Sequence, residues 1–515
     1  MNVSRRSLLA GTGVLALAGG LPRTAVAAAP WRKEGVEPPP RSRFVRKDVA
    51  GLFDADTGAW APELYWYAKA VGWMKERPRT EPNSWEFQWY THGRPRREEG
   101  DPPEWGQCPH RNEYFLPWHR WYLYHFERIV RDVIVTELGQ EDMADWALPY
   151  WNYAHLAPDG DPAASEEWRR IPLPFRQDRI RDPRSGEEED NPLYLPVSMD
   201  GRCLGEDPMA FDQVDPSAAM REESFWPPRN GGTERAGFSQ VLERFPHGLV
   251  HSNISGLMGS VPTAAGDPVF WLHHANIDRF WEAWLNGHQV PDDRVWPQAR
   301  PKHDPEEPDL PFLLRDVNGE PHVLEGPLFD FPEDAYEYES LTDGMGTGEA
   351  RSAFLLAEAP PSTPATTFTV TDDVTHLRTE PLTFSLGGEV GVADTIAGAM
   401  ESAERVVLTF EGVRADAAPC AAFLVFLGGD ESDTDPAGPA FVGHLVFFEN
   451  VGGHGAHLDG TEFSFDVTET LRRLPQQAWS RDQAPVVRVV PGPLAGAKAT
   501  AEADPRFARA AFTVV

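Results

Sequence analysis

The chain has 515 residues, of which 41% are hydrophobic and 25% charged, the composition of an ordinary globular protein. Its 80 acidic side chains outnumber 47 basic ones, so the formal net charge of -33 disfavours nucleic acid, whose phosphates it would repel. No apolar run approaches the roughly 20 residues of a membrane-spanning helix, and three cysteines exclude a disulfide-based scaffold. We therefore expect neither nucleic acid nor membrane as a partner.

The first residues have the pattern of an export signal. Arg5-Arg6 precede an apolar stretch over residues 8–20, and Ala25-Val26-Ala27 offers a small-residue cleavage site. Paired arginines are typical of the twin-arginine route, which carries folded proteins. An ordinary export signal is the alternative. We expect residues 1–27 to be a twin-arginine signal peptide and the protein to be periplasmic or secreted.

Three further segments follow from the change in pattern along the chain. Residues 28–300 concentrate the aromatic side chains, and their apolar residues have helical spacing, which predicts one helical unit. The helical spacing is clearest over residues 115–134, 238–249 and 270–285. Residues 301–365 turn to Pro, Asp and Glu, as in a connector lying over the surface. Short alternating runs over residues 366–515, punctuated by Gly and Asp, predict a β-sandwich.

Several of the 16 histidines fall in arrangements that structure alone does not require. They are His92 in a loop, His110 and His119 around a helix start, His247 and His251 spaced i, i+4 on one helix face, and the adjacent His273 and His274. Burying so many basic groups among Trp and Phe costs free energy unless a metal offsets it. A set of imidazoles without acidic ligands suits copper or zinc.

The sequences around these histidines resemble the copper signatures of the tyrosinase and polyphenol oxidase family of type 3 dicopper proteins. The motifs are Cys108-Pro109-His110, Phe115-Leu116-Pro117-Trp118-His119-Arg120 and Asp267-Pro268-Val269-Phe270-Trp271-Leu272-His273-His274-Ala275-Asn276-Ile277-Asp278-Arg279. The resemblance covers about residues 45–290. It implies a mainly α fold, with a four-helix bundle as the dicopper core and a C-terminal β-sandwich after it.

The resemblance also implies a copper-dependent oxidase. Copper A would be held by His92, His110 and His119, and copper B by His247, His251 and His274. His273 would then lie about 100° round the helix as a supporting group, although the two neighbours are open to a swap. Two copper ions would bind the co-substrate O2 as a bridging peroxide, which oxidises an o-diphenol to its o-quinone and, in a competent site, hydroxylates a monophenol.

Cys108 stands two residues before a ligand, and the resemblance implies a thioether between Cys108 and His110. A buried free thiol is the alternative. Cys203 and Cys420 have no motif, and we interpret them as buried or incidental.

Two acidic residues are placed by helical arithmetic near the ligands. Glu127 lies just over two turns after His119, and Asp278 lies one turn after His274, so both are candidates to fix the tautomer of a ligand. A salt bridge from Asp278 to Arg120 or Arg279 is an equally good interpretation.

The resemblance suggests three residues that govern the substrate. Glu243 matches the glutamate with which plant-type members hold a basic water, but the asparagine that accompanies it is Gly248 here. This departure favours o-diphenols over monophenols. Val261 takes the position where plant catechol oxidases carry a phenylalanine gate, so we expect a substrate site open to bulky phenols.

The C-terminal part more loosely resembles that of plant-type polyphenol oxidases, where a sandwich covers the copper entrance until proteolysis. This implies a latent proenzyme and an activating protease that cuts within residues 335–365. An aromatic side chain, Phe441, Phe447 or Phe448, would fill the entrance.

Three other functions are alternatives. An o-aminophenol oxidase would keep the same scaffold, and a haemocyanin-like oxygen carrier would keep the copper site without turnover. A zinc hydrolase would need a carboxylate at a spacing such as His-Glu-x-x-His, which the chain lacks.

Overall fold

The protein is described from a computed structural model. It describes residues 43–515 except 95–97, 99, 158–160, 162, 199–200, 227–235, 289–292, 303–308, 347–353, 356–365, 386–390, 403, 429–431, 452–459, 475–478, 480–484 and 493–496. The expected signal peptide, residues 1–27, lies outside the described residues.

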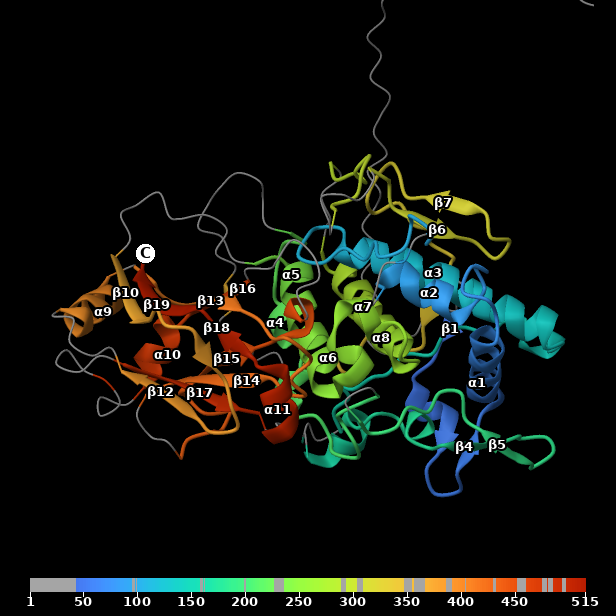
Figure 1. The fold of residues 1–515 in the computed structure, drawn as a ribbon, viewed down its shortest axis with the longest axis horizontal. Coiled ribbons are helices and arrows are strands. Elements are labelled where there is room, and N and C mark those ends of the chain that lie inside the picture. The colour runs from blue at the N-terminus through green and yellow to red at the C-terminus, as the bar shows by residue number, and fades with distance from the viewer. Residues whose placement is uncertain are drawn as a thin grey trace, which may run out of the picture. The chain divides into compact units, whose positions relative to one another are not determined.

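Helices dominate the described part of residues 43–300, as predicted (Figure 1). The longer ones are α1 (Pro62–Lys75), α2 (Trp85–His92), α3 (Phe115–Asp132) and α8 (Val269–Leu285). Shorter ones are α4 (Ser217–Met220), α5 (Phe238–Leu242), α6 (Leu249–Ile254) and α7 (Val261–Ala264). In the part of the chain that the structure describes, no helix has both the length and the apolar character needed to cross a membrane.

Large aromatic side chains hold α3 and α8 together. The rings of Phe126 and Trp271 stack with their centroids 3.3 Å apart, and Tyr122 lies 4.7 Å from the same indole. Trp85 of α2 adds an edge contact to Trp271 at 6.1 Å. Each such ring buries a large apolar area, so these contacts fix how the histidine-bearing helices face one another.

Two local predictions about the histidine segments are wrong. His92 is the last residue of α2, not part of a loop: Ser84 caps the helix by accepting a hydrogen bond from Phe87 N, and Gly93 ends it. The helix predicted over residues 238–249 is interrupted between α5 and α6. Phe245 leaves helical geometry there, because Pro246 has no N–H to donate and disfavours the helical conformation in the residue before it.

The expected C-terminal β region is present as two antiparallel sheets (Figure 1). One has the order β10-β19-β13-β16-β9, built from Thr366–Thr371, Arg509–Val514, Val406–Val413, Thr461–Asp466 and Phe354–Leu355. The other has the order β12-β17-β14-β15, built from Leu382–Ser385, Val486–Pro491, Phe423–Leu427 and Phe441–Leu445. Helices α9 (Val392–Glu401), α10 (Thr468–Arg473) and α11 (Ala497–Ala503) accompany them. Gly443 of β15 packs so closely on Phe465 of β16 that a Cβ there would lie 2.5 Å from the ring, so the sheets lie face to face.

The described part of the connector is bound to the helical core. Strands β6 (Leu313–Arg315) and β7 (Pro321–Val323) form a hairpin, and β8 (Glu337–Tyr338) pairs in parallel with β1 (Val45–Arg46). Arg279 of α8 donates hydrogen bonds to the carbonyl oxygens of Ser340 and Asp343. The connector over residues 313–343 is therefore part of the core rather than a loose link.

A disulfide joins Cys203 of the core to Cys420 of the C-terminal part, across 217 residues of sequence. The interpretation of these cysteines as incidental is wrong. Sequence spacing gave no signal, because the pair meets only when the two parts of the chain dock. Cys108 is buried and is not part of a disulfide.

The disulfide predicts how the cleaved protein behaves. With a specific protease site inserted within residues 347–353, we expect the cut chain to run as one species in a non-reducing gel and as two fragments after reduction, because Cys203–Cys420 spans the cut. The variant Cys203→Ser should give two fragments under both conditions. Separation of the wild-type fragments without reductant would contradict the pairing.

Candidate metal centre and its entrance

The first histidine cluster joins α2, a loop and α3. His92 ends α2, His119 lies in the first turns of α3, and His110 precedes α3 beside Cys108. One nitrogen or sulfur atom from each of these four residues lies within 4.8 Å of the others. The chain thus brings together all three residues predicted to hold one copper ion.

The second cluster joins the turn before α6, α6 itself and α8. His247, His251, His273 and His274 are all buried, and again their ligand atoms lie within 4.8 Å of one another. Nε2 of His251 and Nε2 of His274 are 3.3 Å apart. The ring of His274 also stacks on that of His119 at 4.4 Å, so the two clusters face each other.

Backbone carbonyls orient most of these rings. In four of them the ring nitrogen Nδ1 contacts a backbone carbonyl oxygen. His92 contacts that of Val261 at 3.1 Å. At 2.8 Å each, His119 contacts that of Phe115, His247 that of Glu243 and His251 that of Met258. A proton on Nδ1 leaves Nε2 as the lone-pair nitrogen, which is the form that binds a metal.

The chemistry of the site fits a metal that imidazole binds. Burial lowers the pKa of His247 to about 4 and lowers the pKa of His119, His251 and His274 well below the ordinary value, so the rings are neutral at pH 7. Nε2 of His247 is buried without a hydrogen-bond partner among the described residues. Such an arrangement is costly unless an ion accepts the lone pairs, and neutral imidazoles suit copper or zinc.

His273 and His274 differ in their surroundings. His274 lies between the clusters, against His119 and His251, whereas His273 lies 5.6 Å from Tyr153 and 5.4 Å from His247 by ring centroids. Both nitrogens of His273 lack a hydrogen-bond partner among the described residues. Ligation by His274 stays a prediction, since both rings reach the second cluster.

Glu127 and Asp278, the candidates to fix the tautomer of a ligand, both form ion pairs with arginines, and the tautomer role stays a prediction. Glu127 binds Arg46 at 2.8 Å, and Asp278 binds Arg120 at 2.6 Å, which is one of the two salt bridges considered for it. Although burial opposes it, Arg120 and Arg46 lower the pKa of Asp278. The carboxylates therefore compensate buried arginines behind the site, while carbonyls orient the ligands.

Cys108 lies where a bond to His110 is geometrically accessible. Its Sγ is 3.5 Å from Nδ1 and 3.9 Å from Nε2 of His110. The sulfur therefore lies in contact with the imidazole ring of His110. Sγ also lies 3.3 Å from Nε2 of His119. The thioether stays a prediction that this geometry supports.

One aromatic ring of the C-terminal part covers the clusters. Phe448, in the short helix η9 (Phe448–Asn450), stacks on His251 with centroids 3.8 Å apart and planes 12° from parallel. It also lies 5.5 Å from His247 and 5.8 Å from His110. Phe441 and Phe447 instead pack within the C-terminal sheets. Of the three phenylalanines considered, Phe448 is thus the one at the metal centre.

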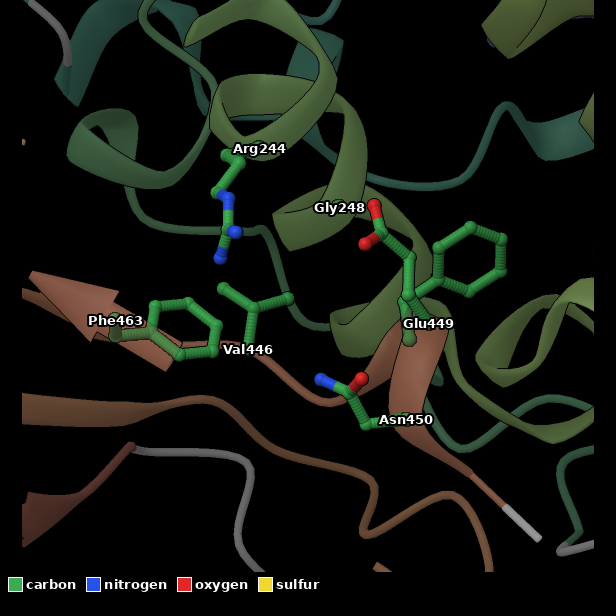
Figure 2. Close-up of a pocket in the computed structure, with 7 residues that line it drawn as sticks. Arg244, Gly248, Val446, Glu449, Asn450 and Phe463 are labelled. Carbon is green, nitrogen blue, oxygen red and sulfur yellow. The ribbon is translucent and has the colours of Figure 1, made fainter. Parts of the chain in front are cut away.

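Phe448 also lines a small pocket, of about 10 Å³, between the two parts of the chain. Figure 2 shows Arg244 and Gly248 of the core facing Val446, Glu449, Asn450 and Phe463 of the C-terminal part. A Cβ at Gly248 would lie 3.4 Å from both the carbonyl oxygen of Glu243 and Cγ1 of Val446. Val261 acts here through its carbonyl, which holds His92.

Charged groups surround this pocket. Glu243 is buried and accepts a hydrogen bond from Arg111 N at 2.7 Å; burial, and then the neighbouring Glu449, raise its pKa. Arg111 binds Glu449 through Nε at 2.5 Å. Although burial opposes it, Arg111 is the chief group that lowers the pKa of Glu449 to about 2. Sequence reasoning missed Arg111 and Glu449, whose only signal was that Arg111 follows a ligand.

The chain resembles known proteins over most of its length. Residues 82–287 match a family model described as the common central domain of tyrosinase. Tyrosinase HcTyr1 of Hahella sp. (strain CCB-MM4) is 30% identical over 458 residues, which are 81% of this chain and 91% of that protein. A chloroplastic polyphenol oxidase of Spinacia oleracea is 29% identical over 309 residues, 53% of this chain and 44% of that one.

Among solved structures, a latent aurone synthase (polyphenol oxidase) co-crystallized with hexatungstotellurate(VI) and soaked in H2O2 matches 94% of this chain and 91% of its own. The TM-score is 0.50 and the sequence identity 17%. This likeness concerns the fold alone.

Metal analysis can show which of the two adjacent histidines of α8 binds copper. We expect His274→Ala to lower the bound copper from about two ions per chain to about one, because the second site loses a ligand, and His273→Ala to keep about two. Mass-spectrometric copper determination on the purified chain, with circular dichroism as a folding control, gives the result. Copper loss in His273→Ala alone would show that His273, and not His274, is the ligand.

Proposed function

The chain belongs to the tyrosinase family, and on that premise we propose that it is a polyphenol oxidase that oxidises o-diphenols to o-quinones with O2. The observation that carries the proposal is the pair of buried histidine clusters, which face each other across the stacked rings of His119 and His274. They would hold the two copper ions of this family. When bound, the copper ions supply the redox chemistry that reduces O2 while the phenol is oxidised.

We assign the first copper to His92, His110 and His119 and the second to His247, His251 and His274. Helices α2, α3, α6 and α8 would be the four helices of the bundle that carries them, because they contribute or flank these ligands. A Cys108–His110 thioether would fix the one ligand that stands in a loop.

The substrate's ring would lie where Phe448 lies now. That position stacks an aromatic ring on His251 and keeps it near His110 and His247. Glu243, four residues before His247, is the candidate to hold the water that takes the phenol proton. Gly248 has no side-chain amide that could help Glu243 hold this water, which supports o-diphenols as the main substrates.

Latency follows from the same geometry. Phe448 fills the entrance, the Arg111–Glu449 ion pair holds η9, and the Cys203–Cys420 disulfide ties the two parts together. An activating protease would cut between residues 347 and 365 rather than earlier, since Tyr336, Tyr338 and Asp343 are hydrogen-bonded to the core. The cut would fall between an oxidase formed by residues 28–300 with the bound connector and a covering domain, residues 366–515, which the disulfide would still hold together.

Export by the twin-arginine route, with cleavage after residue 27, would deliver this proenzyme folded to the periplasm or the exterior. The similarity to a tyrosinase and to a polyphenol oxidase favours turnover over oxygen carriage. Nothing in the site favours an o-aminophenol over an o-diphenol.

Oxygen uptake by the copper-loaded full chain tests both activity and latency. We expect Phe448→Ala to oxidise 4-methylcatechol about tenfold faster or more than the wild type, because the entrance opens to substrate. Phe384→Ala, a matched change in a C-terminal strand away from the entrance, should stay latent. Failure of all three chains to consume O2, with or without detergent activation, would exclude the oxidase. Equal rates in wild type and Phe448→Ala would exclude Phe448 as the cause of latency.

Gly248 gives a test of substrate choice. In the Phe448→Ala chain, Gly248→Asn should raise the rate with tyramine relative to 4-methylcatechol by about tenfold or more, because the amide would help Glu243 hold the basic water. Gly248→Ala is the matched control, since it adds the Cβ without the amide. The same ratio in both variants would show that position 248 does not control hydroxylation.

A further inference from the structure

Two consecutive residues of η9 present a ring and a carboxylate to the core. Phe448 stacks on His251 at 3.8 Å, and the carboxylate of the next residue, Glu449, binds Arg111 at 2.5 Å. The ring and the acid thus enter the metal site together, as one short segment. A phenol that carries a carboxylate on a short side chain has the same two groups.

On the core side of this contact lies the guanidinium of Arg111, whose hydrogen-bond acceptors belong to the C-terminal part. Besides Glu449, the guanidinium of Arg111 donates to Asn450 Oδ1 and Thr461 Oγ1, so its side-chain partners come from the C-terminal part. The Arg111 side chain is only 19% exposed in this covered state. When the C-terminal part moves away, Arg111 therefore loses the carboxylate that now neutralises it and both neutral acceptors.

A second guanidinium lies at the same place. Arg244 lines the pocket with Glu449, as Figure 2 shows. Burial, and the charge of Arg111, lower the pKa of Arg244 to about 10, with Glu449 opposing the shift, and the group still carries its charge at pH 7. Arg111 and Arg244 thus offer two positive charges of the core at the entrance, and the carboxylate of Glu243 accepts from the backbone N–H of Arg111.

The backbone of Arg111 is fixed from within the core. Its N–H donates to Glu243 Oε1 at 2.7 Å, and its φ of 58° is a left-handed value held at that position. This hydrogen bond does not involve the C-terminal part. The backbone at Arg111 is therefore held beside the ligand His110 without the C-terminal part, and a guanidinium carried there suits a carboxylate through paired hydrogen bonds.

We propose that Arg111, with Arg244 beside it, binds the carboxylate of acidic o-diphenols, and that Glu449 occupies this carboxylate subsite in the latent chain. The substrate class is 3,4-dihydroxyphenyl alkanoic acids, preferred over esters, amides or amines of the same size. The inference rests on the proposed function, because it names the substrates of that same site.

The first experiment measures binding without turnover. The copper-loaded full chain with Phe448→Ala and Glu449→Ala, which removes both the ring and the carboxylate, is titrated calorimetrically with 3-phenylpropionate and with 3-phenylpropanamide, neither of which is a phenol. We expect the acid to bind about tenfold tighter than the amide, and Arg111→Gln to remove this difference. Arg472→Gln, an exposed arginine of α10, is the matched control and should keep it.

Equal affinity for acid and amide in the parent chain would overturn the proposal. So would a preference for the acid that survives Arg111→Gln. Neither result depends on oxidation, so this arm fails or succeeds independently of the proposed oxidase function.

The second experiment uses steady-state oxygen uptake by the same chains. With 3-(3,4-dihydroxyphenyl)propionic acid, Arg111→Gln should raise KM about tenfold and leave kcat nearly unchanged, while Arg111→Lys restores part of the KM. KM for the methyl ester and for 4-methylcatechol should not change, which also shows that the variant is folded. A parallel rise for the acid and the ester would assign Arg111 a structural role and overturn the proposal. Absence of uptake with 4-methylcatechol would refute the oxidase itself.

Discussion

The structure depends on burying a set of neutral imidazoles whose metal-binding nitrogens all face one place. A buried ring nitrogen without a partner is costly, and an acceptor fixed on Nδ1 leaves Nε2 as the nitrogen that points inward. Backbone carbonyls provide it for His92, His119, His247 and His251. This requirement explains irregular local structure: His92 lies at the very end of α2, and the chain leaves helical geometry at Phe245, just before His247.

Behind the clusters, buried charge rather than apolar packing alone sets the register of α3 against α8. Arg46 is fully buried and binds both Glu127 and Asp278, one from each helix. Isolated charges there would be strongly destabilising, so their pairing restricts the helices to one arrangement. Tyr336 and Tyr338 donate to Asp278, both at 2.6 Å, so the connector completes the network. The segment that leads away from the oxidase core is therefore also part of its support.

The sequence predicted what local spacing determines and missed what docking determines. The histidine ligands could be predicted because ligands on helices recur at fixed intervals amid aromatic residues. The main local error was the helix predicted over residues 238–249, which a proline interrupts. Cys203 and Cys420 gave no signal, because 217 residues separate them and only the docked parts bring them together. Arg111 and Glu449 were missed for the same reason. Phe448 was one of three candidates, since neighbouring residues of a turn point in different directions, which spacing does not reveal.

Three interactions of different kinds hold the C-terminal part over the metal centre. The stacking of Phe448 on His251 is apolar, the Arg111–Glu449 pair is ionic, and the Cys203–Cys420 bond is covalent. Because the disulfide survives a cut in the connector, η9 stays near the entrance at a high effective concentration. Cleavage alone then loosens the cover without removing it, and a substrate must compete with an intramolecular ring and carboxylate. A substrate that offers both groups competes best, since it replaces the ionic contact as well as the stacked ring.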